Sequence, residues 1–192
     1  MKAIEDTEVE YARQVNLLMR IGQLTSMLRN TVTFLVLVMG AALSQAEGNL
    51  AITKTVQIDA PASAVWAKIR DFNSLNGWHP AVIRDEIVEG ENNTVGTVRL
   101  LTLGDGGTIR EKLLIWDDAG MNLTYNIIEG VLPVRDYVAT LKVERLTDKS
   151  SKVTWSGSFS ASAGADVQKA SDTIRGIYDA GLDNLSKMMS GP

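Results

Sequence analysis

The sequence offers few side chains that could do chemistry, and the most informative is a glutamate in an apolar setting. Glu111 shares alternate positions of a segment with Ile109, Leu113 and Ile115, with Arg110 and Lys112 between them. Alternate residues of a strand share a face, so this spacing predicts that Glu111 points inward with the three apolar side chains. A buried carboxylate costs several kcal/mol unless it is paired or protonated, and such a group normally has a role.

Arg99 is the expected partner of Glu111. It shares the predicted buried face of Leu101 and Leu103 in the preceding strand, and would therefore lie across a hairpin from Glu111. Two interpretations remain open at this stage. The pair orients a ligand in an apolar pocket, or it is a hydrated, structural ion pair at the rim of the sheet.

Aromatic side chains with polar tips are the next candidates. Tyr125, Tyr137 and Trp155 fall on inward-facing positions of their strands, which suits the wall of a cavity for flat molecules. Ordinary core packing explains Trp155 equally well. Tyr178 flanks the apolar stripe of the last predicted helix, and faces either the cavity or the edge of the sheet.

The single histidine has two possible roles. His79 lies between Trp78 and Pro80 at a predicted corner, where it is either a base at the mouth of a cavity or, more commonly, a packing residue. No serine is combined with a histidine and an acid in a recognisable triad. The glycine-rich residues 104–107 join two strands rather than opening a helix, so they do not form a phosphate loop.

The composition excludes several other chemistries. The chain of 192 residues has no cysteine and one histidine, which rules out disulfides and thiolate or multi-histidine metal sites. We therefore expect no metal and no cofactor. Nineteen basic against 23 acidic residues give a net charge of -4, without the basic excess that binds nucleic acid. The length suits one domain, with or without an extension at one end.

The N-terminal region has the pattern of an export signal. Residues 32–43 form an uncharged, mostly apolar run, preceded by Arg29 and followed by Ser44 and Ala46. Small residues at the cleavage positions and a run too short to span a bilayer are typical of a secretory signal. The alternative is an amphipathic helix over residues 9–24 followed by an uncleaved anchor.

These observations set the expected domains. We expect residues 1–46 to be an N-terminal extension and secretory signal peptide, with translation beginning at Met1, Met19 or Met27. Residues 47–192 would then be the mature, periplasmic or secreted domain, with no stable membrane span after cleavage.

The elements that position the candidate residues follow from hydrophobic periodicity. Residues 51–58 alternate as a strand, Pro61 opens a short helix, and residues 73–77 form a second short helix or turn. Turn signals then separate six further strands up to residue 161, which predicts an antiparallel meander. A long helix over residues 166–189 is indicated by an apolar stripe made of Val167, Ala170, Ile174, Ile177, Gly181, Leu182, Leu185 and Met188.

The predicted class is α+β. A curved seven-stranded antiparallel sheet would wrap around the long C-terminal helix, with two short helices after strand 1. A strongly curved sheet does not close on one helix everywhere. We therefore expect a cavity between them that opens near the loops.

Short strings along the chain resemble the START-like helix-grip (SRPBCC) superfamily, which includes polyketide cyclases and dehydrases, the major birch-pollen allergen and the plant abscisic-acid receptors. They are residues 59–66 (DAPASAVW), 71–80, 96–99 (GTVR), 109–113 (IREKL) and 132–134 (LPV), in the same order. Together with the export signal, the sequence is most similar to the periplasmic accessory proteins encoded beside bacterial methanol dehydrogenase. The resemblance implies the helix-grip fold and a hydrophobic cavity, but not catalysis.

The resemblance also bears on the ligand. In receptor relatives, an acidic residue in a strand segment similar to that around Glu111 contacts the ligand through water. The loop that corresponds to residues 104–107 is a mobile gate in those relatives. The alternative for residues 104–107 is an ordinary hairpin turn. Those relatives hold an acidic ligand with a lysine near the start of the second strand, where this chain has Pro80-Ala81-Val82-Ile83. The resemblance therefore does not extend to recognition of a carboxylic-acid hormone.

We expect an exported, non-enzymatic protein that binds a small hydrophobic molecule, such as a lipid, a polyketide-like or an aromatic compound, and that could serve a periplasmic dehydrogenase as an accessory factor. One alternative is a cyclase- or dehydratase-like enzyme with Glu111 or His79 as acid–base and Tyr137 polarising a carbonyl. Another is an interaction protein whose cavity is filled by its own side chains. The predicted ligand-binding residues are Arg99, Leu101, Leu103, Glu111, Leu113, Tyr125, Tyr137, Trp155, Ile174, Ile177 and Tyr178, with Trp78, His79, Leu132 and Pro133 at the mouth.

Overall fold

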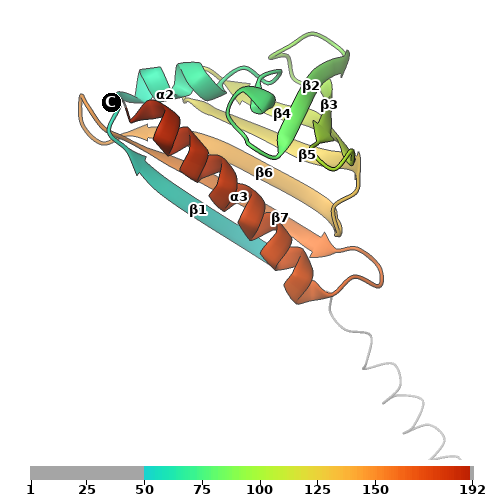
Figure 1. The fold of residues 1–192 in the computed structure, drawn as a ribbon. Helices are drawn as coiled ribbons and strands as arrows, with labels where there is room; N and C mark the ends of the chain where they lie inside the picture. Colours follow the sequence, from blue (N-terminus) through green and yellow to red (C-terminus); the bar gives the residue numbers. More distant parts are fainter. Residues whose placement is uncertain (1–49, 191–192) are drawn as a thin grey trace, which may run out of the picture. The chain divides into compact units, whose positions relative to one another are not determined.

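The computed structural model describes residues 50–190 (Figure 1). The predicted extension and signal peptide, residues 1–46, lie outside the described residues. Within the described part, no helix combines the length and the apolarity needed to cross a membrane.

One antiparallel sheet of seven strands organises the domain. Its spatial order is β1-β7-β6-β5-β4-β3-β2, so every neighbour after the first pair is also a sequence neighbour. The strands are β1 (Leu50–Ile58), β2 (Val82–Glu89), β3 (Val98–Leu103), β4 (Thr108–Asp117), β5 (Asn122–Gly130), β6 (Val134–Arg145) and β7 (Ser151–Ala161).

The helices all lie on one side of this sheet (Figure 1). α2 (Ala62–Ile69) and the 3₁₀ turn η1 (Leu75–Gly77) follow β1, and α3 (Val167–Met189) closes the domain. Asp166 caps α3 by accepting a hydrogen bond from the Lys169 backbone N–H at 2.7 Å, which satisfies one of the free amides at the start of the helix. α3 packs along β1 and β7, as the helix-grip arrangement requires.

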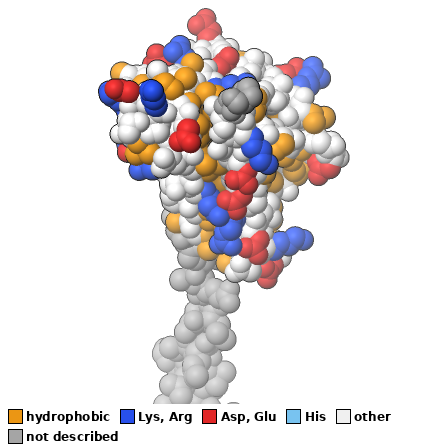
Figure 2. All heavy atoms as spheres, turned by 60° about the vertical axis from the view of Figure 1, so that its left-hand side comes forward, with side chains coloured by type: hydrophobic (Ala, Val, Ile, Leu, Met, Phe, Trp, Pro, Cys, Tyr) orange, Lys and Arg blue, Asp and Glu red, His pale blue; other side chains and the backbone are white. Residues whose placement is uncertain are grey.

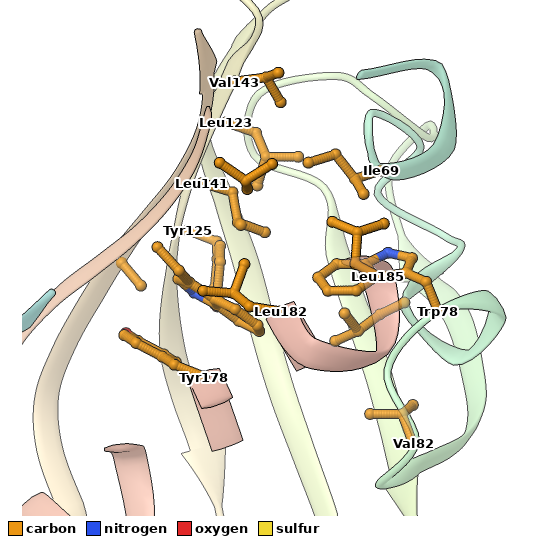
Figure 3. Packing of buried hydrophobic residues seen from close by; sticks show 14 of the residues in the cluster. Ile69, Trp78, Val82, Leu123, Tyr125, Leu141, Val143, Tyr178, Leu182 and Leu185 are labelled. Atoms are coloured by element: carbon orange, nitrogen blue, oxygen red, sulfur yellow. The ribbon is translucent and has the colours of Figure 1, made fainter. Parts of the chain in front are cut away.

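The core fills the space between the sheet and the helices (Figure 3). Leu182 and Leu185 of α3 meet Leu141 of β6, while Trp78 approaches from the segment after η1. Each such side chain contributes about 1.5–3 kcal/mol when fully buried. The outer surface carries acidic and basic side chains in mixture, without a field of one sign on the face shown in Figure 2.

The predicted α+β helix-grip fold with seven strands is confirmed, and so is the inward face of β6 formed by Tyr137, Ala139, Leu141 and Val143. The second short helix is reduced to three residues of 3₁₀ turn. Pro61 was expected inside the first helix but stands just before it, as its N-cap.

Three residues expected on buried faces are exposed. Ile115 is 50% exposed because the register of β4 against β5 shifts between Leu113 and Ile115. An extra residue in a strand reverses the alternation after it, and Trp116 is partly buried in its place. Val167 and Met188, in the first and last turns of α3, are 52% and 46% exposed.

Two glycines of α3 give a test of this packing. A Cβ at Gly181 would lie 2.6 Å from His79 Cδ2 and 2.8 Å from Trp155 Cζ3, whereas one at Gly176 would meet nothing within 4 Å. We expect Gly181→Ala to lower the free energy of unfolding by about 1–3 kcal/mol through overpacking. Gly176→Ala should raise it by up to about 1 kcal/mol through helix propensity. Urea unfolding measures both, and equal effects of the two substitutions would contradict the packing.

Candidate functional site

A cavity of about 70 Å³ lies between the sheet and α3. It has room for on the order of five water-sized groups. Its wall is almost entirely apolar and is drawn from η1 and the segment after it, from β2 to β7, and from α3. The lining residues are Leu75, His79, Ala81, Val82, Leu101, Leu103, Ile109, Glu111, Tyr125, Ile127, Leu132, Tyr137, Trp155, Ile174 and Ile177.

Glu111 reaches the cavity from β4 and is paired with Arg99 of β3. The two residues are directly opposite each other in the ladder, and they are 4% exposed each. Arg99 donates from Nε to Glu111 Oε2 at 2.8 Å, and its Nη2 lies 2.6 Å from the same oxygen. Among the described residues, Oε1 of Glu111 accepts no hydrogen bond, and it is the oxygen left to a molecule in the cavity.

Arg99 is held on all sides. Its Nη1 donates to the Phe72 carbonyl oxygen at 2.7 Å and lies 3.5 Å from Asp85 Oδ2. The guanidinium carbon lies 4.1 Å from the centre of the Phe72 ring and 5.4 Å from that of Tyr125, which adds cation–π attraction. Arg99 therefore ties the segment before η1 to β2, β3 and β4.

Asp85 of β2 is the third member of this buried charge cluster, which we define as Asp85, Arg99 and Glu111. Its Oδ2 accepts from the Leu75 backbone N–H at 2.9 Å. Its Oδ1 is buried and has no hydrogen-bond partner within the described structure. Two carboxylates thus share one guanidinium, and the cluster carries a net negative charge when both are ionised.

Burial dominates the proton affinities of the cluster. It raises the pKa of Glu111, with the Arg99 charge and hydrogen bond acting in the opposite direction. It raises the pKa of Asp85 as well, opposed by Arg99 and by the Leu75 N–H. Removing Arg99 would leave two buried carboxylates without a compensating charge. Such a change typically lowers the free energy of unfolding by about 3–5 kcal/mol.

His79 is a lining residue but a poor base. Its Nδ1 accepts from the Ala81 N–H at 3.2 Å, so its Nε2 carries the proton and donates to the Ile177 carbonyl at 2.9 Å. Burial lowers its pKa, which keeps the ring neutral. The imidazole holds the segment after η1 against α3 rather than presenting a free nitrogen.

Tyr125, Tyr137 and Trp155 form an aromatic, polar-tipped part of the wall, with Tyr178 of α3 packed behind it. Trp155 Nε1 donates to the Tyr125 hydroxyl at 3.0 Å, and the hydroxyls of Tyr137 and Tyr178 are 2.6 Å apart. Tyr178 stacks on Trp155 with ring centres 4.5 Å apart. Burial raises the pKa of all three tyrosines, so the hydroxyls stay protonated.

Most of the predicted site residues come together around the cavity. Arg99, Leu113, Tyr178, Trp78 and Pro133 do not line it: the first four are buried behind the wall, and Pro133 lies in the loop beyond Leu132. Five lining residues were not among the predicted ligand-binding and mouth residues: Leu75, Ala81, Val82, Ile109 and Ile127. Ile109 and Ile127 share strand parity with Glu111 and Tyr125, a signal that could have found them.

Two loops that adjoin the lining residues Leu103 and Leu132 touch each other. The β3–β4 turn is closed by a hydrogen bond from the Gly106 N–H to the Leu103 carbonyl at 2.9 Å, and Gly106 has φ of +87°, a conformation that favours glycine. A Cβ at Gly107 would lie 2.9 Å from Val131 of the β5–β6 loop. The two loops therefore touch, and Val131 remains 59% exposed.

Residues 49–189 match the family model described as polyketide cyclase / dehydrase and lipid transport. The chain belongs to this family, and so to the START-like superfamily that the sequence resembled. The family description names both polyketide cyclases or dehydrases and lipid transport.

Individual proteins are similar over parts of the chain. The abscisic acid receptor PYL2 of Arabidopsis thaliana is 33% identical over 103 residues, which are 52% of this chain and 54% of the receptor; the chain thus spans about half the length of that relative. The structure of XoxI from Bacillus cereus is 32% identical, with a TM-score of 0.67 over 72% of this chain and 94% of XoxI. The Zhui aromatase/cyclase of Streptomyces sp. R1128 shares the fold at 18% identity, with a TM-score of 0.65 over 74% of this chain and 94% of the cyclase.

The raised pKa of Asp85 predicts a pH dependence of stability. The folded chain takes up a proton on Asp85 at a higher pH than the unfolded chain, whose ordinary pKa is 3.8. The stabilisation from this proton is complete below that value and is lost as pH rises through the raised pKa. We expect the free energy of unfolding of the wild type, minus that of Asp85→Asn, to grow as pH falls from 7 to 4 in urea titrations.

Asp172 supplies the control for this prediction. It pairs with Arg175 on the exposed side of α3, where an ion pair contributes about 0–1 kcal/mol. The difference in the free energy of unfolding between the wild type and Asp172→Asn should change little between pH 7 and pH 4. A difference for Asp85→Asn that is constant, or that shrinks toward acid pH, would contradict the assignment.

Proposed function

We propose that this protein is an exported binding protein that holds a small hydrophobic molecule in the cavity between the sheet and α3. The observation that carries the proposal is the cavity itself, which has an apolar wall and a single ionisable carboxylate at its surface, Glu111. Small-molecule sites combine these features: apolar surface provides affinity and a few polar groups fix orientation. The family, with its lipid-transport and cyclase members, supports the same conclusion.

The cavity volume limits the ligand. About 70 Å³ accepts a short aliphatic or compact molecule, whereas a lipid or a polyketide needs more room. The contact between the β3–β4 turn and Val131 is the place where the mouth would widen, because both segments are loops at the surface. A larger ligand would therefore have to separate these two loops.

A cyclase- or dehydratase-like activity is the second candidate, because Glu111 and Tyr137 both line the cavity. In that reaction a protonated Glu111 would exchange a proton with the substrate and the Tyr137 hydroxyl would polarise a carbonyl. His79 is dropped from this candidate since both its ring nitrogens are bonded. Glu111→Gln and Tyr137→Phe separate the candidates: loss of turnover with binding retained would favour the enzyme.

An accessory role beside a periplasmic dehydrogenase remains part of the proposal. Its support is the resemblance noted from the sequence together with the export pattern of residues 32–46. Recovery of a dehydrogenase by the tagged full-length protein would support it, and recovery of none would leave ligand binding as the whole function.

Binding to the cavity can be followed at Trp155, one of four tryptophans. We expect n-butanol to shift the indole N–H signal of Trp155 saturably in NMR spectra of the full chain, because this indole lies in the cavity wall. The signal of Trp116, which donates to the Arg70 carbonyl away from the cavity, should not move.

Filling the cavity provides the matched control. Leu103→Phe places added volume in the cavity, whereas Leu114→Phe places it on the outer face of β4, where Leu114 is 36% exposed. We expect Leu103→Phe to weaken butanol binding at least about tenfold, equivalent to about 1.4 kcal/mol. Saturation unaffected by Leu103→Phe, or no saturable shift in the wild type, would contradict the proposed function.

Export has its own test. Cleavage after Ala46 would give a mature chain that begins at Glu47, as small residues precede signal-peptidase sites. N-terminal sequencing of the protein from a periplasmic or culture fraction should therefore read from Glu47. A chain that retains residues 32–43 in that fraction, or one found uncleaved in the cytosol, would contradict export by a cleaved signal.

A further inference from the structure

The polar groups around the cavity are unequally available to a ligand. The ring nitrogens of His79 are both bonded, and the Tyr125 hydroxyl already accepts the Trp155 indole N–H. The Tyr137 hydroxyl is engaged with Tyr178. Glu111 is the lining residue that retains an oxygen without a hydrogen bond within the described structure, because both contacts from Arg99 end on its Oε2.

This oxygen is an acceptor in a site that is net negative when both carboxylates of the cluster are ionised. Asp85 and Glu111 face a single Arg99, and their side chains are 0% and 6% exposed. Of these three residues Glu111 lines the cavity, and no Lys, Arg, Asp or second Glu joins it there among the described residues. His79 is neutral and the tyrosines are protonated, so neither offsets the charge. A buried negative charge of this kind is stabilised by a cation that can donate a hydrogen bond.

The remaining wall favours a cation too. The rings of Tyr125, Tyr137 and Trp155 line the cavity, and aromatic faces attract ammonium groups, most strongly where water is excluded. The structure already uses this interaction beside the cavity, where the Arg99 guanidinium carbon lies 4.1 Å from the centre of the Phe72 ring and 5.4 Å from that of Tyr125.

We propose that the preferred ligand of the cavity is a small apolar molecule with an ammonium group, whose N–H groups donate to Glu111 Oε1 while its hydrocarbon part contacts the apolar wall. This inference rests on the proposed ligand-binding function and narrows its ligand class. It excludes carboxylic acids, which the net negative charge of the cluster repels. A neutral alcohol of the same length can donate one hydrogen bond to the same oxygen, but without the charge.

Three isosteric probes test the inference on the full chain at pH 7: n-butylammonium, n-butanol and n-butyrate, each followed by the Trp155 indole signal. We expect n-butylammonium to bind at least about tenfold more tightly than n-butanol, and n-butyrate to bind most weakly. Glu111→Gln should abolish the preference for the ammonium while retaining n-butanol binding within about threefold, since an amide fills the same space without charge.

Asp85→Asn is the second variant, because it neutralises the cluster without altering the lining of the cavity. In Asp85→Asn the affinity for n-butylammonium relative to that for n-butanol should fall as well. This variant therefore keeps the test decisive even where Glu111→Gln unfolds the protein. Equal or tighter binding of n-butanol to the wild type, or an ammonium preference that survives both substitutions, would overturn the inference and leave the proposed function standing. Failure of every probe to bind would instead contradict the proposed function.

Discussion

The burial of Arg99 between two carboxylates is the constraint on which the site depends. A guanidinium that is 4% exposed must have each of its donors satisfied, since an unpaired buried charge costs several kcal/mol. Glu111, Asp85 and the Phe72 carbonyl provide those acceptors from three separate segments. The position of η1, the pairing of β2 with β3, and the inward direction of Glu111 are therefore fixed together.

This arrangement explains how a small domain can keep a cavity beside a charged group. Glu111 of the cluster and the aromatic side chains of Tyr125, Tyr137 and Trp155 line the same apolar space, and the Arg99 guanidinium carbon lies 5.4 Å from the centre of the Tyr125 ring. Gly181 allows α3 to approach Trp155 and His79 closely, so the helix closes one side of the cavity, and the loops that carry Gly107 and Val131 adjoin the lining residues Leu103 and Leu132. The result is a narrow pocket rather than a lipid-sized one.

Much of this arrangement follows from periodicity, and the rest does not. The alternation around Glu111 and the parity of Arg99 were enough to predict that both point to the inner face, because most residues of that face are apolar, whereas a buried pair and a hydrated pair at the rim both remained possible. Asp85 was not predicted, since its strand carries neighbouring charges on both faces and its burial depends on the distant Arg99 and Leu75. Ile115 was placed wrongly because a β-bulge leaves no signature in hydrophobicity, and the cavity volume depends on side-chain packing that no pattern encodes.

The most direct test of the account is the free energy of unfolding of Arg99→Met. We expect Arg99→Met to lower the free energy of unfolding by about 3–5 kcal/mol. Adding Asp85→Asn and Glu111→Gln to this variant should restore much of that stability, because no uncompensated buried charge is then left in the cluster. Arg175→Ala, in the exposed pair with Asp172 on α3, should cost at most about 1 kcal/mol. An Arg99→Met loss no larger than that of Arg175→Ala, or one that the added substitutions do not reduce, would contradict the central role of the cluster.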